Sequence, residues 1–413
     1  MLRQTATILR RRARGTSASA ASRRPASRPL SRLALGAATP LFELERFFAV
    51  HEFSCKRSVC NSDTEAVTLA EALALMDAET RGLWDAQSLG YTETKGHPAM
   101  LAELEVLYPG AACQEIAPQE GILLAYAALL EPGDGVVATA PGYQSWFTCA
   151  EAAGGVVTRW TASETSDGSP YFDVDDLERA CDAADNLKVV AANFPHNPTG
   201  YQPPPDDWRR VVDICASRGV HLFADEIYRG LGEEVLESAA AYEKGVALGG
   251  LSKSMGMPGA RVGWLASRDA AFLARVAELR DYTTICSSAP SQILGLAALR
   301  NRDALLERAN GYVAAGRKAA EAVVENHSDK LSWGAGPVAG PVGYIRLARG
   351  SASAYVDALV RSDDGLMLLP STVFHAGDAH VRIGFGRADS PETLGLWAAT
   401  LDDADHPATR LLV

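Results

Sequence analysis

The sequence predicts an α/β fold, with a mostly parallel, doubly wound sheet in a large domain and a smaller α+β domain beside it. Short apolar segments alternate with helical segments between residues 135 and 250, which is the pattern of a parallel sheet covered on both faces. Polar residues directly follow several of these segments, where ligands bind in such sheets. Beyond residue 330, strand-like and helix-like segments mix, which predicts the second domain.

The composition is that of a globular protein. The chain has 413 residues, of which 47% are hydrophobic and 22% are charged, so collagen-like, coiled-coil and wholly disordered classes are excluded. No segment reaches the ~18 consecutive apolar residues that a membrane span needs, so no membrane partner is expected. The net charge of −12 argues against a nucleic-acid partner, because such binding depends on cations that contact phosphates.

Residues 1–40 differ in composition from the rest of the chain. They contain nine Arg and no Asp or Glu, and they are rich in Ser and Ala. This composition is typical of a transit peptide. We therefore expect a disordered, transit-like extension that directs the protein to an organelle, with a mitochondrion favoured over a plastid. If the extension is not a signal, the expected location is the cytoplasm.

The first elements after the extension are expected to be helices. Apolar residues at helical spacing predict helices over residues 69–86, 98–107 and 119–130. Pro98 suits the first turn of the second helix. A buried strand is expected over residues 135–140, since a short apolar run there ends at Pro141.

Strands and helices then alternate. The expected strands cover residues 155–160, 187–193, 220–224 and 246–249, and the expected helices cover 174–183 and 206–217. Short apolar strands joined by helices predict a parallel sheet. Asn197, Asp225 and Lys253 would then lie beyond the carboxyl ends of successive strands, at one edge of the sheet.

The C-terminal part has a mixed pattern. The expected helices cover residues 270–281, 291–325, 353–361 and 391–401, and the expected strands cover 343–347, 366–369 and 380–385. We expect four parts of the chain: the extension 1–40, an N-terminal part of the small domain 41–90, the large domain 91–290 and the C-terminal part of the small domain 291–413.

Four short motifs occur in a fixed order. They are Asn197-Pro198-Thr199-Gly200, Asp225-Glu226-Ile227-Tyr228, Ser252-Lys253 and Arg261, and 28 residues separate Asn197 from Asp225 and Asp225 from Lys253. Together with Arg382, this ordered set resembles the class I/II aminotransferases of fold type I, which depend on pyridoxal 5′-phosphate (PLP). The resemblance covers roughly residues 42–401. It implies an aspartate aminotransferase-like fold with a large PLP-binding domain.

The resemblance implies roles for the residues that contact the cofactor ring. Lys253 would form a Schiff base with PLP and transfer protons, because this chemistry requires an amine. Asp225 would keep the pyridine nitrogen protonated, since a nearby carboxylate favours the cation. Glu226, its neighbour, could compete for this role. Tyr228 and Asn197 would hydrogen-bond the phenolate oxygen of the ring.

Further residues are implied to bind the cofactor. Ser252 and Arg261 would bind its phosphate, and Tyr143 would stack on the ring face. Gln119 offers a backbone and a side-chain donor at the expected helix start. Pro118 has no backbone N–H, so one donor to the phosphate is expected to be missing.

The resemblance also implies one residue that binds the substrate and one that contacts a second subunit. Arg382 would bind the α-carboxylate of an amino acid or 2-oxo acid through two parallel hydrogen bonds, with Asn197 beside it. Tyr91, in the segment 90–96, resembles the tyrosine that reaches the phosphate in the neighbouring subunit. We therefore expect a homodimer.

The substrate side chain is not defined by the sequence. A second carboxylate would need a cation, for which Arg280, Arg387 and Lys95 are candidates. Asp63 and Glu65 could instead favour a basic side chain. No metal is expected, because the seven Cys and eight His do not show the spacing of metal ligands.

The expected reaction is transfer of an amino group from an L-amino acid to a 2-oxo acid. Residues 58–65, 90–96 and 280–286 resemble a subgroup that includes capreomycidine synthase-like proteins, which use PLP for replacement and ring closure. A lyase or cyclase, which includes C–S lyase-like chemistry, is therefore one alternative. A non-catalytic protein with the PLP fold is the other.

Overall fold

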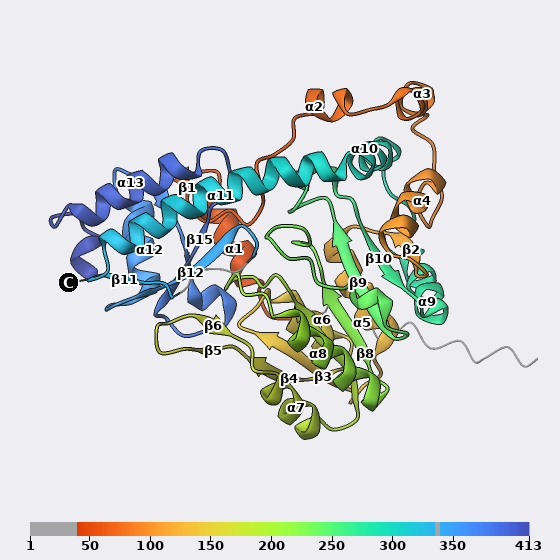
Figure 1. Cartoon of the computed structure of the whole chain (residues 1–413), viewed down its shortest axis with the longest axis horizontal. Helices are drawn as coiled ribbons and strands as arrows, with labels where there is room; N and C mark the ends of the chain where they lie inside the picture. The colour runs from red at the N-terminus through yellow and green to blue at the C-terminus, as the bar shows by residue number, and fades with distance from the viewer. Residues whose placement is uncertain (1–38, 335–338, 413) are drawn as a thin grey trace, which may run out of the picture.

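The computed structural model describes residues 39–334 and 339–412. The expected transit-like extension, residues 1–40, therefore lies almost entirely outside the described residues. Figure 1 shows a larger part built around one sheet and a smaller part that holds the C-terminal elements.

A mixed seven-stranded sheet forms the centre of the larger part. In spatial order its strands are β2 (Ala112–Glu115), β10 (Gly263–Ser267), β9 (Gly245–Gly250), β8 (His221–Asp225), β7 (Leu187–Asn193), β3 (Gly135–Ala140) and β4 (Val156–Thr161). The five strands from β9 to β4 are parallel, while β10 pairs antiparallel with β9 and β2 pairs antiparallel with β10 at one edge. The expectation of a mostly parallel sheet is confirmed, and the antiparallel edge is an addition that the sequence pattern does not predict.

Helices cover both faces of this sheet because its strands are apolar on both faces. In β3, Val136 packs with α5, α6 and α9 on one face, and Val137 packs with α7 and α8 on the other. These helices, with α4 near the antiparallel edge, are α4 (Pro98–Leu107), α5 (Pro118–Leu129), α6 (Ser145–Ala152), α7 (Val174–Ala183), α8 (Pro205–Arg218) and α9 (Ala270–Arg280).

A four-stranded antiparallel sheet forms the smaller part. Its order is β11 (Leu331–Ser332), β12 (Val342–Leu347), β15 (His380–Gly384) and β14 (Leu369–Pro370). Helices α12 (Ala352–Arg361) and α13 (Ser390–Asp402) pack on it, and Trp397 donates a 2.8 Å hydrogen bond to the hydroxyl of Tyr355 inside this core. The predicted α+β character of this region is confirmed.

The N-terminal segment contributes to both parts. Helix α1 (Glu43–His51) packs near the short 3-10 helix η3 (Ser371–Phe374), and β1 (Arg57–Ser58) pairs in parallel with β13 (Leu366–Met367). Helices α2 (Leu69–Ala74) and α3 (Ala78–Ala86) instead pack on α10 (Ala289–Arg300). The expected domain division at residues 90 and 290 stays a prediction.

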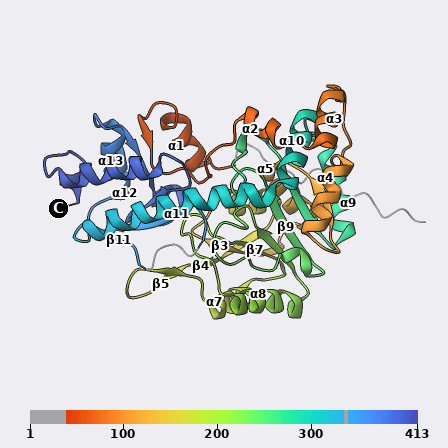
Figure 2. The same cartoon turned by 45° about the horizontal axis from the view of Figure 1, so that its top comes forward.

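Helix α11 (Arg302–Asn326) runs from the larger part across to the small sheet, and both views show it spanning the two (Figures 1 and 2). The remaining short elements are β5 (Ser163–Glu164), β6 (Pro170–Tyr171), η1 (Ala239–Ala241), η2 (Pro258–Ala260) and η4 (Thr409–Leu411). Within residues 39–334 and 339–412, no helix has the length and apolar character needed to cross a membrane.

Three elements that the sequence predicts as continuous are each divided in two in the structure. The helix expected over 69–86 breaks before α3, because the carboxylate of Asp77 accepts a 2.7 Å hydrogen bond from the backbone of Thr80 and starts a new helix. The helix expected over 291–325 breaks at Asn301, whose side-chain amide donates to the carbonyls of Leu75 and Ala297 at 2.9 Å. The strand expected over 366–369 is two strands, which pair in different sheets.

Candidate active site

A cavity of about 340 Å³ lies at the carboxyl ends of β7, β8 and β9, where the larger part faces α1 and β15. Ten of the eleven residues predicted from the sequence line it, and Tyr91 does not. The ten are Lys253, Asp225, Tyr228, Asn197, Ser252, Arg261, Tyr143, Gln119, Pro118 and Arg382. Residues far apart in the sequence therefore meet in one place.

Lys253 lies in the loop that follows β9, with its amine inside the cavity. Its Nζ donates a hydrogen bond of 2.9 Å to Oγ of Ser62. Burial lowers the pKa of the Lys253 amine from its ordinary value, while the carboxylate of Asp63 opposes the shift. A lowered pKa increases the share of neutral amine, which is the form that acts as a nucleophile or base.

Asp225 ends β8 and presents a buried carboxyl group to the cavity. Burial raises the pKa of Asp225 to about 7, and its Oδ1 accepts a 3.0 Å hydrogen bond from the backbone of Ile227. A cationic ring nitrogen in the cavity would restore the charged form, so this carboxyl group fits the predicted role.

Asn193 at the end of β7 holds the neighbouring loops in place. Its Oδ1 accepts a 2.8 Å hydrogen bond from the backbone of Asn197, and its Nδ2 donates to the carbonyl of Asp225 at 3.2 Å. The side chain of one buried residue thus fixes the two predicted site residues relative to each other.

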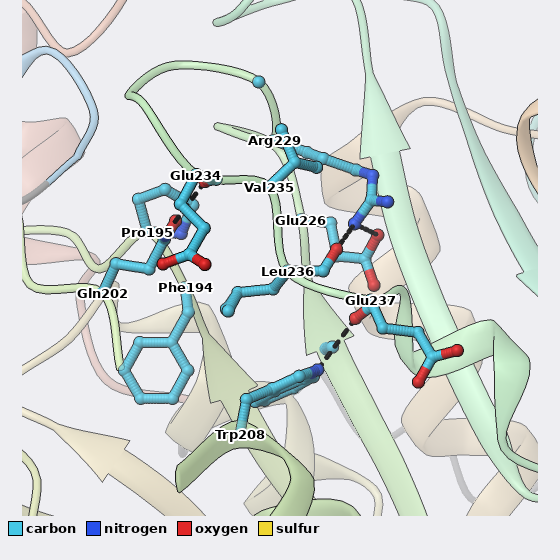
Figure 3. A pocket seen from close by; sticks show the side chains of 12 residues that line it. Phe194, Pro195, Gln202, Trp208, Glu226, Arg229, Glu234, Val235, Leu236 and Glu237 are labelled. Carbon is cyan, nitrogen blue, oxygen red and sulfur yellow. Dashed lines mark hydrogen bonds and ion pairs between the residues drawn. The ribbon is translucent and has the colours of Figure 1, made fainter. Parts of the chain in front are cut away.

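Glu226 points away from Asp225 and from this cavity. Its Oε1 accepts hydrogen bonds of 2.8 Å from Oγ of Ser238 and from the backbone of Ala239, and Arg229 lies 3.6 Å from its Oε2. Figure 3 shows Glu226 with Arg229 in a separate pocket, which also contains Trp208. Glu226 therefore does not compete with Asp225 at the cavity.

Arg382 lies in the middle of β15 and is only 1% exposed. Its Nη1 donates to Oδ1 of Asn197 at 2.9 Å, and its Nη2 donates to the carbonyl of Cys60 at 2.6 Å. The flanking Val381 and Ile383 pack into the core of the smaller part, since neighbouring side chains on a strand face opposite ways. The guanidinium is therefore rigidly held with its remaining N–H groups available to a carboxylate.

Two tyrosines lie at the cavity wall. The hydroxyl of Tyr143 donates a 2.8 Å hydrogen bond to Oε1 of Glu45 on α1. Burial raises the pKa of Tyr228 to about 12, although Arg382 and a hydrogen bond with Ser62 oppose the shift. Both rings lie where the sequence predicts contacts with the cofactor ring.

The four residues expected near the phosphate all line the cavity. Pro118 occupies the first turn of α5, where a missing N–H removes no bond within the helix, and the Gln119 side chain donates to Oγ of Ser145 at 2.6 Å. The buried Oγ of Ser252 has no hydrogen-bond partner among the described residues. Arg261 is exposed, lines the cavity and has a left-handed backbone with φ of 56°.

These features fit PLP. A buried carboxyl group with a raised pKa suits the pyridine nitrogen, a buried amine suits the aldehyde, and the unpaired hydroxyl of Ser252 beside a helix start suits a phosphate. Among the described residues no group of His, Cys, Asp and Glu is arranged to hold a metal ion.

Tyr91 lies outside this cavity. Its side chain is 90% exposed, and it lines a separate hollow of about 270 Å³ beside residues 286–290. Its predicted contact with a partner subunit stays a prediction.

The residues proposed to select the substrate side chain have other partners. Arg280 is buried and bonded to Glu115 at 3.2 Å, so it is not a free cation in the cavity. Arg387 binds Asp63 at 2.9 Å, which neutralises both groups. Glu65 accepts a hydrogen bond from the backbone of Ala388, and Lys95 is exposed and does not line the cavity.

Ser62 and Glu45 are two polar residues of the cavity that the sequence does not predict. Neither belongs to a strand end or to a recognisable motif. Both lie in the N-terminal segment, which reaches the cavity only through the packing of α1 and the pairing of β1 with β13. The unusual segment 58–65 is the only sequence signal that points to Ser62.

Comparisons with known proteins agree with this site. Residues 88–394 match the family described as aminotransferase class I and II. Capreomycidine synthase from Streptomyces vinaceus is 28% identical over 398 residues, which cover 90% of this chain and 96% of the relative. Arginine–pyruvate transaminase from Pseudomonas aeruginosa is 28% identical, over 69% of this chain and 71% of the relative.

A solved structure shows the same fold. A PLP-dependent aminotransferase from Streptococcus suis superposes with a TM-score of 0.81 at 25% identity, which covers 89% of this chain and 99% of the other. The fold and the cavity thus define a PLP-dependent transaminase of fold type I. The chain belongs to the aminotransferase class I and II family, and its cofactor is PLP.

Proposed function

We propose that the protein transfers the amino group of a basic L-amino acid to a 2-oxo acid. The observation that carries this proposal is the meeting, in one cavity, of the buried amine of Lys253, the buried guanidinium of Arg382 and the carboxylate of Glu45. When bound, PLP supplies an electron sink that stabilises negative charge at the substrate Cα.

Each residue of the cavity has a separate role in this reaction. Arg382 binds and orients the α-carboxylate, because its fixed fork of donors matches two oxygens. Lys253 attaches the cofactor and, once released by substrate, accepts the proton from Cα at Nζ. Asp225 pairs with the ring nitrogen, and Ser252, Arg261 and the start of α5 hold the phosphate.

The carboxylate of Glu45 is the group proposed to bind a basic side chain of the substrate. Its Oε1 accepts a hydrogen bond from Tyr143, but no described Lys or Arg forms an ion pair with it. Asp63, in contrast, is already paired with Arg387. The similarity to a transaminase named for arginine supports the same substrate class.

The proposal is tested with purified protein loaded with PLP and single amino acids. The visible band of the lysine-linked cofactor should form in the wild type and be absent in Lys253→Ala. Arginine or lysine should bleach it, and pyruvate or 2-oxoglutarate should restore it. A clear preference for neutral or acidic amino acids would overturn the assignment of a basic substrate.

A matched pair of variants tests Glu45 itself. Glu45→Gln should lower kcat/KM for arginine at least about tenfold, because a charge-assisted contact is lost, and should leave that for methionine unchanged. Glu43→Gln is the control, since Glu43 lies on the same helix and does not line the cavity. Equal losses for both amino acids would show that Glu45 acts on folding or on the cofactor instead.

A second candidate function is ring closure or elimination on an amino acid. The similarity to capreomycidine synthase over 90% of the chain favours it. In that case the visible band would persist during turnover, and ammonia or a cyclic amino acid would accumulate in place of a 2-oxo acid. Mass spectrometry of the products distinguishes the two reactions.

We also propose a homodimer in which Tyr91 reaches the active site of the partner. Tyr91 and Leu89 are both exposed and line one hollow beside residues 286–290, which supports burial against a second copy. Light scattering should give twice the chain mass. A mixture of Tyr91→Phe and Lys253→Ala chains should form hybrids with one intact site, whereas a monomer would give no recovery of activity on mixing.

The N-terminal extension is proposed to direct the protein to a mitochondrion in preference to a plastid. The support is its nine Arg and its lack of acidic residues. Residues 1–40 fused to a fluorescent protein should co-localise with a mitochondrial dye. A plastid or diffuse cytoplasmic signal would contradict the assignment.

A further inference from the structure

The segment from Cys60 to Thr64 connects the lysine loop to the small sheet. The Cys60 carbonyl accepts from Arg382 at 2.6 Å. Thr64 donates to the carbonyl of Lys253 twice, from its Oγ1 at 2.7 Å and from its backbone N–H at 3.3 Å. The segment is thus held at both ends by contacts that do not involve the side chain of Ser62.

Ser62 lies between these two attachments and turns its hydroxyl toward the reacting amine. Its Oγ accepts a hydrogen bond of 2.9 Å from Nζ of Lys253. The same hydroxyl interacts with Tyr228, where its hydrogen bond lowers the pKa of the phenol against the larger effect of burial. A serine hydroxyl has one proton to donate and two lone pairs. When the proton is directed to Tyr228, a lone pair faces Lys253.

We propose that Ser62 is a further catalytic residue, whose hydroxyl orients the amine of Lys253 and stabilises its protonated state. The proposal depends on the proposed role of Lys253. When the Cα–H bond breaks, its electron pair stays with the substrate carbon and its proton forms a new N–H bond at Nζ. Ser62 then accepts a hydrogen bond from the resulting ammonium group, so no further reactant is needed.

The first test is the pH dependence of cofactor capture. Cofactor-free protein is mixed with PLP, and the rate at which the visible band appears is followed against pH. Only the neutral amine attacks the aldehyde, and an acceptor beside the ammonium favours the charged form. Ser62→Ala should therefore move the midpoint of this profile down by about one pH unit, since a charge-assisted hydrogen bond is lost.

The second test is the rate of the proton step. In a single turnover with amino acid in excess, Ser62→Ala should bleach the band at least about tenfold more slowly. The isotope effect from Cα-deuterated substrate should become larger as that step limits the rate.

Three variants separate chemistry from structure. Ser62→Thr keeps the hydroxyl and should behave as the wild type, while Ser62→Cys keeps the size but is a weak acceptor and should behave as Ser62→Ala. Ser58→Ala is the control, because Ser58 lies just before this segment, donates to Oδ1 of Asn61 at 3.0 Å and does not line the cavity.

These experiments distinguish an error in the role of Ser62 from an error in the role of Lys253. If the wild type forms no visible band, the role of Lys253 is wrong. If the wild type forms the band, and neither Ser62→Ala nor Ser62→Cys changes the capture profile or the single-turnover rate, Ser62 is not catalytic. If Ser62→Ala and Ser58→Ala change both readouts equally, the segment acts only as a structural support.

Discussion

Nη1 of Arg382 donates a 2.9 Å hydrogen bond to Oδ1 of Asn197, which joins the small sheet to the loop beyond β7 across the cavity. Both residues are buried, so the contact is shielded from solvent. The group proposed to bind the substrate carboxylate is therefore aligned by a residue expected to contact the cofactor ring.

Replacing Arg382 with Lys should raise KM for the amino acid about 10- to 100-fold. Lysine keeps the positive charge but lacks the planar fork, and each hydrogen bond between charged groups contributes about 1.5–3 kcal/mol. Steady-state kinetics measure the effect, with the exposed Arg410→Lys as the control. An unchanged KM would exclude Arg382 as the carboxylate site.

The cofactor-free protein should lose stability as pH rises from about 4 to about 7. Burial raises the pKa of Asp225 to about 7, so the native state holds a proton that the unfolded chain releases near pH 4. The loss is expected to reach up to about 4 kcal/mol above pH 7, from roughly three pH units at about 1.4 kcal/mol each.

The Asp225→Asn variant checks this linkage. Asparagine does not titrate, so the free energy of unfolding of the cofactor-free variant should be flatter over the same pH range. Urea unfolding at pH 5, 6, 7 and 8 measures it. The same variant should bind PLP more weakly, because the ring nitrogen loses its anionic partner. Parallel pH profiles for both proteins would contradict the prediction.

Replacing Arg280 with Ala should destabilise the fold by about 3–5 kcal/mol without changing the substrate preference. The change leaves the carboxylate of Glu115 buried without its cationic partner. The exposed Arg268→Ala is a control that should alter stability by less than about 0.5 kcal/mol. Loss of activity toward one substrate class alone, at normal stability, would restore Arg280 as a specificity residue.

Replacing Gly384 with Ala should disturb the active site from a distance. A Cβ at this position would lie 1.8 Å from the carbonyl oxygen of Asn61, so the segment beside Ser62 must move away from β15. We expect a lower melting temperature together with a lower rate of cofactor capture. In contrast, Gly395→Ala on α13 meets no atom within 4 Å and should be neutral or slightly stabilising. Equal behaviour of the two variants would show that the contact at Asn61 is unimportant.

Local sequence patterns predict the parallel part of the fold well. The strands β3 and β7 and the helices α4 and α7 have the bounds that their apolar spacing predicts. Strands buried on both faces give continuous apolar runs, which are easy to recognise. Asp225 and Lys253 are found for the same reason, since each follows such a run.

The remaining features depend on contacts between distant residues. The break at Asn301 arises from its hydrogen bond to Leu75, and the antiparallel edge arises from the pairing of β10 with β9 and β2. Ser62 and Glu45 enter the cavity only after the N-terminal segment has packed against both parts of the molecule. None of these relationships leaves a periodic trace in the sequence.

One glutamine of the larger part binds the start of helix α1 by two hydrogen bonds. The Gln144 side chain accepts from the backbone of Glu43 and donates to the carbonyl of Leu41, both at 2.9 Å. The helix presents Leu44, Glu45 and Phe48 to the cavity, while the cofactor-binding residues lie on other elements. Under the role proposed for Glu45, substrate preference would depend on this short segment. Diversifying these three positions should yield enzymes with new specificities while the chemistry stays intact, which gives natural or directed evolution a route that leaves the core sheet unchanged.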